Sequence, residues 1–374
     1  MSDPLFEPIT IGALKLPNRL VMAPMSQGKA PGGILHPAHA GFYRRRAEGG
    51  TGLIISGATS IGHDRAAFDD NEAHFHGPAL HGWAKVVEDV HAGGGRIIPQ
   101  LGHAGLQGLA AQPLAEPSFG PSGIWLPGAQ VGIEAGPERD GPIMTLADVD
   151  AVIEAFVAAV QSAQRVGFDR AEIHAAHGFL IDQFLWGRTN RRTDHYGLDR
   201  ARFAAEIVAA CRAAVGPDYP ILMRISQFKM TDYDARLAET PDELARLIEP
   251  IAAAGVDCFD CSQRRYFRPE FPGSPLNFAG WVKKLSGKPT IGGGGIGLAK
   301  TSLEYGETNI YATVAPTAID HLDDVREKLS RGEFDMVSLG RAILGDPAWA
   351  HKVREGRHAE LTPFKPELMM SLDG

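Results

Sequence analysis

The chain has 374 residues, of which 44% are hydrophobic, and a formal net charge of −8. This length corresponds either to two average domains or to one large α/β barrel, and the acidic balance argues against nucleic acid or an anionic membrane surface as the main partner. Only three cysteines occur, which is too few for a disulfide framework and is typical of a reducing compartment, so we expect a cytoplasmic protein.

Signals for membrane insertion and secretion are missing from the sequence. No apolar run approaches the roughly 20 residues that a membrane-spanning helix needs. The N-terminal segment MSDPLFEPITIG has neither the basic stretch nor the apolar stretch of a signal peptide, so we expect none.

Short apolar runs recur along the chain and predict parallel strands that are buried on both faces. Amphipathic segments between them predict helices, the clearest of which are Thr145–Val166, Asp199–Val215 and Thr240–Ala254. Strands that alternate with helices in this way predict a single α/β domain over residues 1–374, a (β/α)8 TIM barrel. The eight predicted strands are Leu20–Ala23, Gly52–Ser56, Arg96–Leu101, Arg170–His174, Pro220–Ile225, Asp257–Ser262, Pro289–Gly293 and Met336–Leu339.

Long irregular segments interrupt this alternation. Residues 103–141, after the third strand, contain many glycines and prolines and are predicted to form an extended lid over the barrel mouth, with some short structure of its own. Residues 297–320 precede the last long helix and show no clear pattern, and residues 366–374 are expected to form a C-terminal tail.

The fourth predicted strand ends in two histidines, His174 and His177, just before the turn at Gly178. Chemistry in such barrels gathers at the C-terminal ends of the strands. Two imidazoles side by side can donate two hydrogen bonds to one oxygen, which suits a site that polarises a carbonyl or nitro group or holds an oxyanion. A purely structural pair is the alternative. A metal site that uses Glu172 with His174 is disfavoured, because the first strand ends in APMSQ rather than in a histidine pair, so no metal is expected.

Cys258 and Cys261 form a CxxC motif, which raises the question of a redox or metal role. The motif lies inside the predicted strand VDCFDCS rather than at the start of a helix. Residues three apart in a strand point to opposite faces. We therefore expect both cysteines to pack as small apolar side chains.

Several motifs in order resemble the old yellow enzyme family of FMN-dependent ene-reductases. They are FEPITIG and LPNRLVMAPM near the N-terminus, HxxHGF-LIDQF with TNRRTDHYG after the fourth strand, and GRAILGDP after the eighth. The resemblance covers nearly the whole chain. One position departs from the family, because Phe179 stands where a tyrosine is usual.

The resemblance implies that FMN is the cofactor and identifies the residues that bind it. Ser26 would lie beside flavin O4 and N5, and Gln100 would pair with the pyrimidine edge through its amide. Arg224, inside the apolar strand ILMRIS, would lie beside N1 and C2=O, with a salt bridge to barrel acids as the alternative. FMN is favoured over FAD because no GxGxxG occurs in a strand–turn–helix setting. The other matched positions are Ala23, Pro24, Met25, Gly57 and Ala58 along the ring, and Gly294, Gly295, Gly340 and Arg341 at the phosphate.

The resemblance also implies a two-step reaction. NADPH or NADH would reduce FMN, and hydride would then pass to the activated C=C of an α,β-unsaturated carbonyl or nitro compound held by His174 and His177. In many family members the tyrosine at the Phe179 position gives the final proton. Phenylalanine has none, so water or another acid such as Tyr266 must supply it, or the substrate differs.

Other functions on the same barrel stay open. One is an FMN-dependent dehydrogenase, demethylase or quinone reductase, although the Cys-rich iron–sulfur motif of the multidomain versions is missing here. Another is a flavin-binding protein in which Phe179 impairs ene reduction. The physiological acceptor, the choice between NADPH and NADH, and assembly into a homo-oligomer also stay open. Arginines of the loop Arg264–Phe271 would contact an acidic substrate group or the NADPH phosphate, or be solvated, and Arg44–Arg46 are expected to be solvated.

Overall fold

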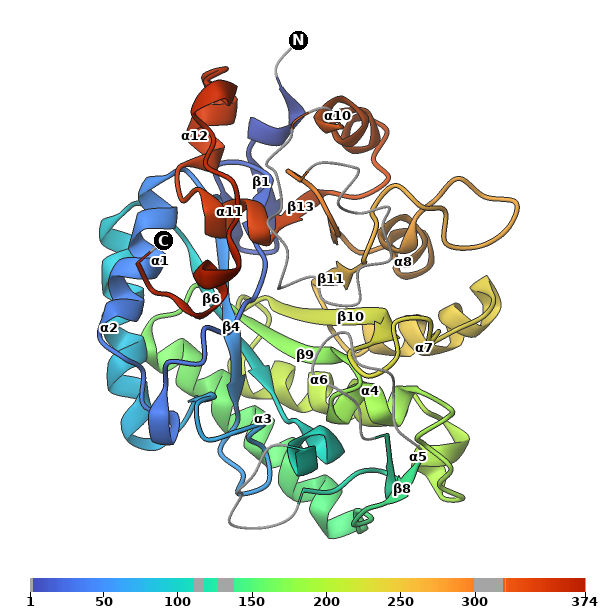
Figure 1. Ribbon diagram of the computed structural model, residues 1–374. Coiled ribbons are helices and arrows are strands. Elements are labelled where there is room, and N and C mark those ends of the chain that lie inside the picture. The colour runs from blue at the N-terminus through green and yellow to red at the C-terminus, as the bar shows by residue number, and fades with distance from the viewer. Residues whose placement is uncertain (1–2, 111–117, 127–137, 299–318, 320, 374) are drawn as a thin grey trace.

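The computed structural model describes residues 3–110, 118–126, 138–298, 319 and 321–373. Parallel strands close into a barrel at its centre, and helices surround them (Figure 1). Their order is β3-β13-β12-β11-β10-β9-β6-β4, and β4 pairs back onto β3. The predicted TIM barrel and all eight predicted strands are confirmed. The bounds are β3 (Leu20–Met22), β4 (Leu53–Ser60), β6 (Ile97–Gly102), β9 (Ala171–His177), β10 (Ile221–Lys229), β11 (Cys258–Ser262), β12 (Thr290–Gly293) and β13 (Met336–Leu339).

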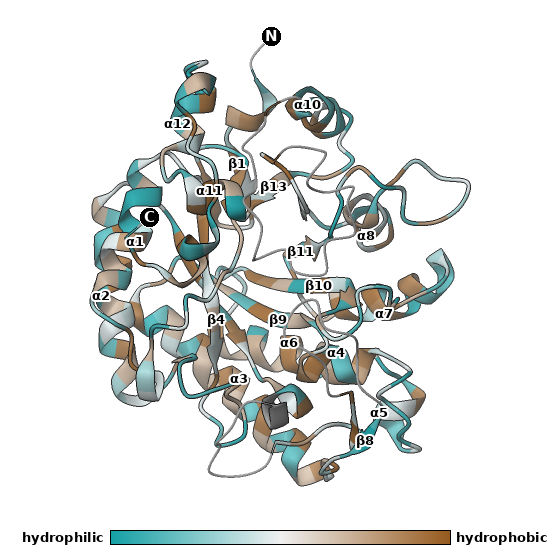
Figure 2. Cartoon of the chain, viewed as in Figure 1, coloured by the Kyte–Doolittle hydropathy of each residue, from teal (hydrophilic) through white to brown (hydrophobic). Residues whose placement is uncertain are grey.

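The barrel interior is filled at the N-terminal ends of its strands. An antiparallel hairpin, β1 (Ile9–Ile11) with β2 (Leu14–Leu16), packs there against buried strand residues such as Leu53 and Leu222. Strands β9 and β10 show brown stretches interrupted by teal ones in the hydropathy view (Figure 2), because polar residues such as Glu172 and Arg224 are buried among their apolar residues. Because the hairpin covers one end, the C-terminal ends of the strands are left for a site.

The cysteines of β11 behave as the sequence predicted. Cys258 belongs to the core inside the barrel, whereas Cys261 belongs to the larger core between strands and helices. Both are buried and form no disulfide, and burial raises the pKa of each thiol. Within the described residues, no three or more His, Cys, Asp or Glu side chains are grouped so as to hold a metal ion.

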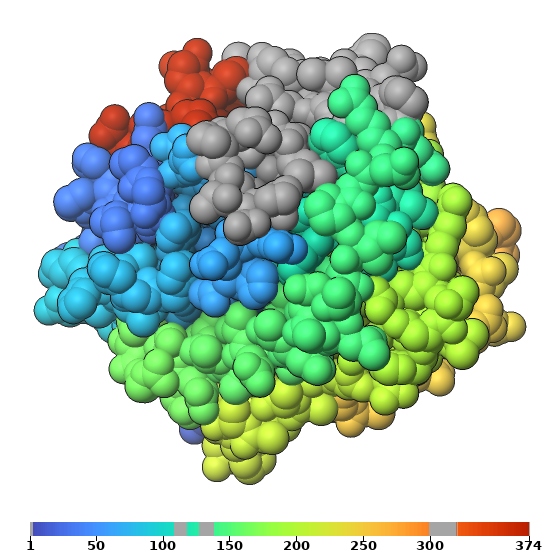
Figure 3. All heavy atoms as spheres, turned by 90° about the horizontal axis from the view of Figure 1, so that it is seen from below, coloured from blue at the N-terminus to red at the C-terminus, as the bar shows by residue number. Residues whose placement is uncertain are grey.

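The helices begin and end at residues whose chemistry explains the boundary. Thr145 and Asp148 form a reciprocal capping box at the start of α3, and Gly167 ends it with φ 95°. Helices α3 and α6 pack against each other, and their green and yellow-green side chains adjoin on the face in Figure 3. The helices are α1 (Ala38–Glu48), α2 (Leu80–Ala92), α3 (Leu146–Val166), α4 (Leu180–Leu185), α5 (His195–Leu198), α6 (Arg202–Val215), α7 (Pro241–Ala253), α8 (Phe278–Ser286), α10 (Leu322–Ser330), α11 (Arg341–Gly345) and α12 (Trp349–Arg354).

The predicted lid and tail are described in part. The 3-10 helix η4 (Gly105–Ala110) follows β6, and β7 (Ile124–Trp125) pairs with β8 (Arg139–Asp140). Residues 111–117 and 127–137, and most of the second irregular segment, lie outside the described residues, so the lid stays a prediction. The tail contains η6 (Pro366–Met370). The other short elements are β5 (Ala73–His74), η1 (Pro4–Phe6), η2 (Pro31–Gly33), η3 (Gly77–Ala79) and η5 (His358–Glu360).

The helices bear on two expectations from the sequence, the lack of a membrane-spanning helix and the exposure of Arg44–Arg46. Among the described helices, none is both long and apolar enough to cross a membrane. The expectation that Arg44–Arg46 is a solvated face is wrong for Arg46, which is fully buried. Its guanidinium lies 3.7 Å from the Phe42 ring centroid and donates to the Phe42 carbonyl at 2.8 Å. Burial lowers the pKa of Arg46 to about 9.

Candidate active site

The two histidines lie together at the C-terminal end of β9. Their ring centroids are 5.3 Å apart and the rings are nearly perpendicular, at 84°. His177 has φ 66°, a left-handed conformation that costs a residue with a Cβ about 1–2 kcal/mol. Two bonds to β10 and the loop after it fix this conformation. The His177 N–H donates to Ser226 Oγ at 2.9 Å, and its carbonyl accepts from Met230 N at 3.1 Å.

Neighbouring groups decide which ring nitrogens of the two histidines carry hydrogen. His174 Nδ1 accepts from the Ala176 N–H at 3.3 Å, so its hydrogen is on Nε2. His177 Nε2 lies 2.8 Å from Ser262 Oγ, which itself accepts from Arg224 Nη2 at 3.3 Å. With Arg224 occupying one acceptor position of Ser262, we assign the serine hydrogen to the bond with Nε2, which places the hydrogen of His177 on Nδ1.

Both imidazoles are neutral near pH 7. Burial, followed by the charge of Arg224, lowers the pKa of His174 to about 3. The same two causes, in the same order, hold the pKa of His177 well below its usual range. The site thus presents two neutral N–H donors, His174 Nε2 and His177 Nδ1. Such donors bind an oxygen that is gaining negative charge more strongly than they bind a neutral oxygen.

A buried ion pair holds the turn that follows His177. Asp182 Oδ2 accepts from the Gly178 N–H at 2.6 Å, and Lys229 Nζ donates to Asp182 Oδ1 at 2.7 Å. The two charged side chains are fully buried. Burial raises the pKa of Asp182 and lowers that of Lys229, and the opposite charge of each partner opposes these shifts. This pair was not predicted from the sequence, because the predicted strand ended at Ile225 whereas β10 continues to Lys229.

Phe179 lies where a proton donor beside the histidines would be expected. Its ring is edge-on to the His174 ring, with centroids 4.8 Å apart. It is also edge-on to the Phe68 ring, with centroids 6.1 Å apart. Tyr266 is buried in the segment that follows β11. Its hydroxyl donates to the backbone carbonyl of His321 at 3.4 Å, so the structure gives no support for Tyr266 as the proton donor.

Four polar side chains form a network inside the barrel, beneath the histidines. Gln100 Nε2 donates to Glu172 Oε1 at 2.7 Å, and Arg224 is ion-paired with Asp260. Burial, followed by the charge of Asp260, holds the pKa of Glu172 well above its usual range. Arg224 therefore forms a salt bridge with an acid inside the barrel, which was the predicted alternative to a contact with the flavin. Glu172 and Asp260 were missed as site residues, although acids inside apolar strands are a signal that partners are needed.

Residues at the C-terminal ends of β3 and β4 form another part of the barrel mouth. Ser26, Gln27, Gly57 and Ala58 line one pocket. A Cβ at Gly57 would lie 2.7 Å from the Met25 carbonyl oxygen, so close packing of the two strand ends by itself requires glycine there. Ala23 and Pro24 follow β3 directly, and the Ala23 N–H donates to Leu339 O at 2.9 Å.

The last two strands end in the predicted phosphate turns. Gly294 and Gly295 have φ of 110° and 83°, conformations that favour glycine, and a Cβ at Gly294 would lie 2.3 Å from the carbonyl oxygen of Gln263. Gly340 precedes α11, and Arg341 is its first residue. The ends of β12 and β13 thus place these four residues at neighbouring strand ends.

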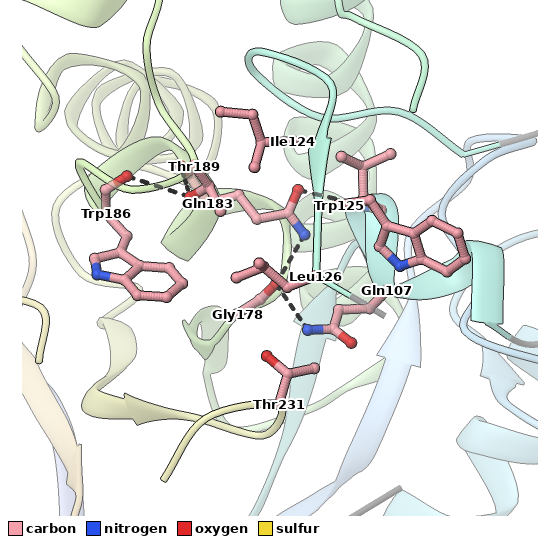
Figure 4. Close-up of a pocket in the computed structure, with 10 residues that line it drawn as sticks. Gln107, Ile124, Trp125, Leu126, Gly178, Gln183, Trp186, Thr189 and Thr231 are labelled. Carbon is pink, nitrogen blue, oxygen red and sulfur yellow. Dashed lines mark hydrogen bonds between the residues drawn. The ribbon is translucent and has the colours of Figure 1, made fainter. Parts of the chain in front are cut away.

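A further pocket lies beside the turn at Gly178 (Figure 4). Trp125 and Leu126 from the predicted lid line it on one side, and Trp186 and Thr231 complete it. Gln183 lies between, and its Nε2 donates to the Gly178 carbonyl at 2.7 Å. Gly178, which directly follows His177, is among the residues that line this pocket.

Comparison with known proteins identifies the family. The model of the NADH:flavin oxidoreductase / NADH oxidase family matches residues 4–360. The chain belongs to this family. It is 30% identical to an NADPH dehydrogenase of Bacillus velezensis, over 96% of this chain and 97% of that protein. It is equally identical to a metal reductase of Desulforamulus reducens, but spans only 50% of that protein.

Solved structures agree with this assignment. Morphinone reductase superposes with a TM-score of 0.78 at 27% identity, covering 98% of this chain and 93% of that one. An old yellow enzyme homologue from Zymomonas mobilis, at 22% identity, has the same fold with a TM-score of 0.77. The predicted family is confirmed, and with it FMN as the cofactor and NADH or NADPH as the reductant.

Unpaired donors at the barrel mouth suit this cofactor. Among the described residues, Gln27 Nε2, Arg224 Nε and Gln263 Nε2 are buried without a hydrogen-bond partner. A buried donor left unpaired costs about 1–3 kcal/mol, so such groups are expected to meet acceptors. The N1 and N5 atoms and the two carbonyl oxygens of an oxidised flavin are acceptors of this kind. The residues present therefore fit FMN.

Proposed function

We propose that the protein is an NADPH- or NADH-dependent ene-reductase whose acceptor is a small α,β-unsaturated carbonyl or nitro compound. FMN, when bound, supplies hydride transfer from the nicotinamide to the acceptor. Gln100 and Arg224 would hold its pyrimidine edge, Ser26 its O4 and N5 side, and Gly294, Gly295, Gly340 and Arg341 its phosphate. Ala23, Pro24, Met25, Gly57 and Ala58 would lie along the ring system.

The observation that carries the proposal is the pair of neutral donors, His174 Nε2 and His177 Nδ1. Each would donate to the electron-withdrawing oxygen of the acceptor. Negative charge collects on that oxygen as hydride reaches the β-carbon, and the donors bind the charged form more strongly than the neutral form. One such donor is typically worth a factor of about 10²–10³ in rate.

The final proton must come from a source other than Phe179. The ring of Phe179 fills the space beside His174 without offering a hydrogen, and the hydroxyl of Tyr266 is engaged with His321. We therefore assign protonation of the α-carbon to water. A slow or weakly stereospecific protonation step is the expected consequence.

Phe179 also favours a second candidate, reduction of a quinone. Reduction of a quinone to a hydroquinone ends with protonation at oxygen, so no carbon has to be protonated stereospecifically. The aromatic rings of Phe179 and Phe228 beside the histidines, with Phe68 against Phe179, would suit a flat, apolar acceptor.

Anaerobic stopped-flow spectroscopy on the purified holoenzyme separates the two. The flavin is first reduced with NADPH and then mixed with 2-cyclohexenone or with a benzoquinone, while flavin absorbance is followed. Rapid reoxidation by the enone, with cyclohexanone as the product, is the expected result. Reoxidation by the quinone alone would overturn ene reduction and support the second candidate.

A further inference from the structure

A row of aromatic rings leads from the catalytic histidines to one arginine. The Phe228 ring lies against His177, with centroids 5.1 Å apart, and Tyr233 meets Phe228 edge-on at 5.8 Å. The guanidinium carbon of Arg264 lies 3.9 Å from the Tyr233 ring centroid. Phe228, Tyr233 and Arg264 thus form a continuous row that begins at His177 and ends in a cation.

The backbone that carries Arg264 is tied to the catalytic residues. Ser262, two positions before it, contacts His177 Nε2 at 2.8 Å. Gln263 Oε1 accepts from the Phe278 N–H at 3.0 Å, which anchors the loop to the start of α8. Arg264 itself is half-buried. Its position relative to the histidines is therefore fixed by the fold rather than by a loose surface loop.

Two acidic residues of the adjoining loops, Glu270 and Asp232, are engaged with other cations. Glu270 accepts from Arg236 at 2.6 Å and from Gln227 at 2.9 Å, and Asp232 pairs with Arg188 at 3.5 Å. In the part of the chain that the structure describes, no carboxylate lies within 4.0 Å of the Arg264 guanidinium. A guanidinium stacked on a ring keeps its in-plane N–H groups available, and these match the two oxygens of a carboxylate or phosphate.

We propose that Arg264 binds the anionic group of the molecule that stacks in the site, so that substrates bearing a carboxylate or phosphate are preferred. This inference rests on the proposed function and specifies its substrate class. The anionic group has two possible sources, a carboxylate on the acceptor and the 2′-phosphate of NADPH. The same arginine chemistry recognises both, and experiment must distinguish them.

The test compares Arg264→Gln with Arg268→Gln, a matched control in the same loop whose side chain is exposed. Oxidised holoenzyme is titrated with 6-oxoheptanoate and with its methyl ester, and binding is read from the flavin absorbance. Because no turnover is needed, a failure of ene reduction leaves this test intact. Separately, the rate of flavin reduction is measured against the concentrations of NADPH and NADH.

The expected result is that wild type binds the carboxylate more tightly than the ester. Arg264→Gln should abolish this preference, weakening carboxylate binding at least about tenfold while leaving the ester unchanged. If instead the variant loses a preference for NADPH over NADH, the source of the anion is the reductant. Unchanged preferences in both assays, or an equal loss in Arg268→Gln, would overturn the proposal.

Discussion

The ion pair of Lys229 and Asp182 offers a sharp test of how the site is held. Lys229→Met removes the ammonium group and keeps an unbranched side chain of similar size. Asp182 would then be a fully buried carboxyl that still accepts from the Gly178 N–H but has lost the cation 2.7 Å away. Breaking a buried pair on one side typically costs about 3–5 kcal/mol, because the remaining charge is uncompensated. We expect a loss of this size in the free energy of unfolding.

A double variant separates charge from packing. Adding Asp182→Asn to Lys229→Met removes both charges and keeps an acceptor for Gly178, so most of the lost stability should return. Urea unfolding of the holoenzyme, followed by circular dichroism, measures both variants. The reasoning is refuted if Lys229→Met stays within about 1 kcal/mol of wild type, or if the double variant is no more stable than the single one.

Three further predictions concern the groups at and beneath the histidine pair. Glu172→Gln should change stability by less than about 1 kcal/mol, because burial and Asp260 keep Glu172 protonated, whereas Asp260→Asn leaves Arg224 unpaired and should cost about 3 kcal/mol or more by urea titration. The folded-state pKa of His174, about 3, lies below its ordinary value of 6.5, so its contribution to stability is present above pH 6.5 and is lost as pH falls toward 3. The loss amounts to about 1.4 kcal/mol per pH unit, and His174→Asn should remove that part of the acid dependence measured by urea unfolding. Phe179→Tyr should speed reoxidation of the reduced flavin by 2-cyclohexenone in stopped flow, and an unchanged rate would tell against a protonation bottleneck.

The barrel could be predicted from the sequence because its signals are local. Parallel strands buried on both faces give continuous apolar runs, and Thr145 with Asp148 marks a helix start within four residues. The histidine pair was predictable for the same reason, since His174 and His177 both lie at the end of one strand, just before one turn. The extra length of β10, which carries Lys229, was not visible, because Phe228 is the one apolar residue among the four that follow Ile225 in the strand.

The partners of the buried charges could not be predicted. An arginine in an apolar strand indicates that a partner exists, but strand register decides which one. In the barrel, Arg224 pairs in register with Asp260 on one side and with His174 on the other. Asp260 is 36 residues away in sequence, so only the folded barrel brings the two together. The burial of Arg46 likewise depends on packing that the pattern of one helix does not contain.

The central claim is that His174 and His177 stabilise charge on the acceptor oxygen. Its most direct test is the anaerobic stopped-flow assay on His174→Ala and His177→Ala, with the two half-reactions measured separately. Each variant should slow reoxidation of the flavin by 2-cyclohexenone about 10²-fold or more, while reduction by NADPH changes much less. Reoxidation at the wild-type rate in both variants, with the flavin still bound, would contradict the account.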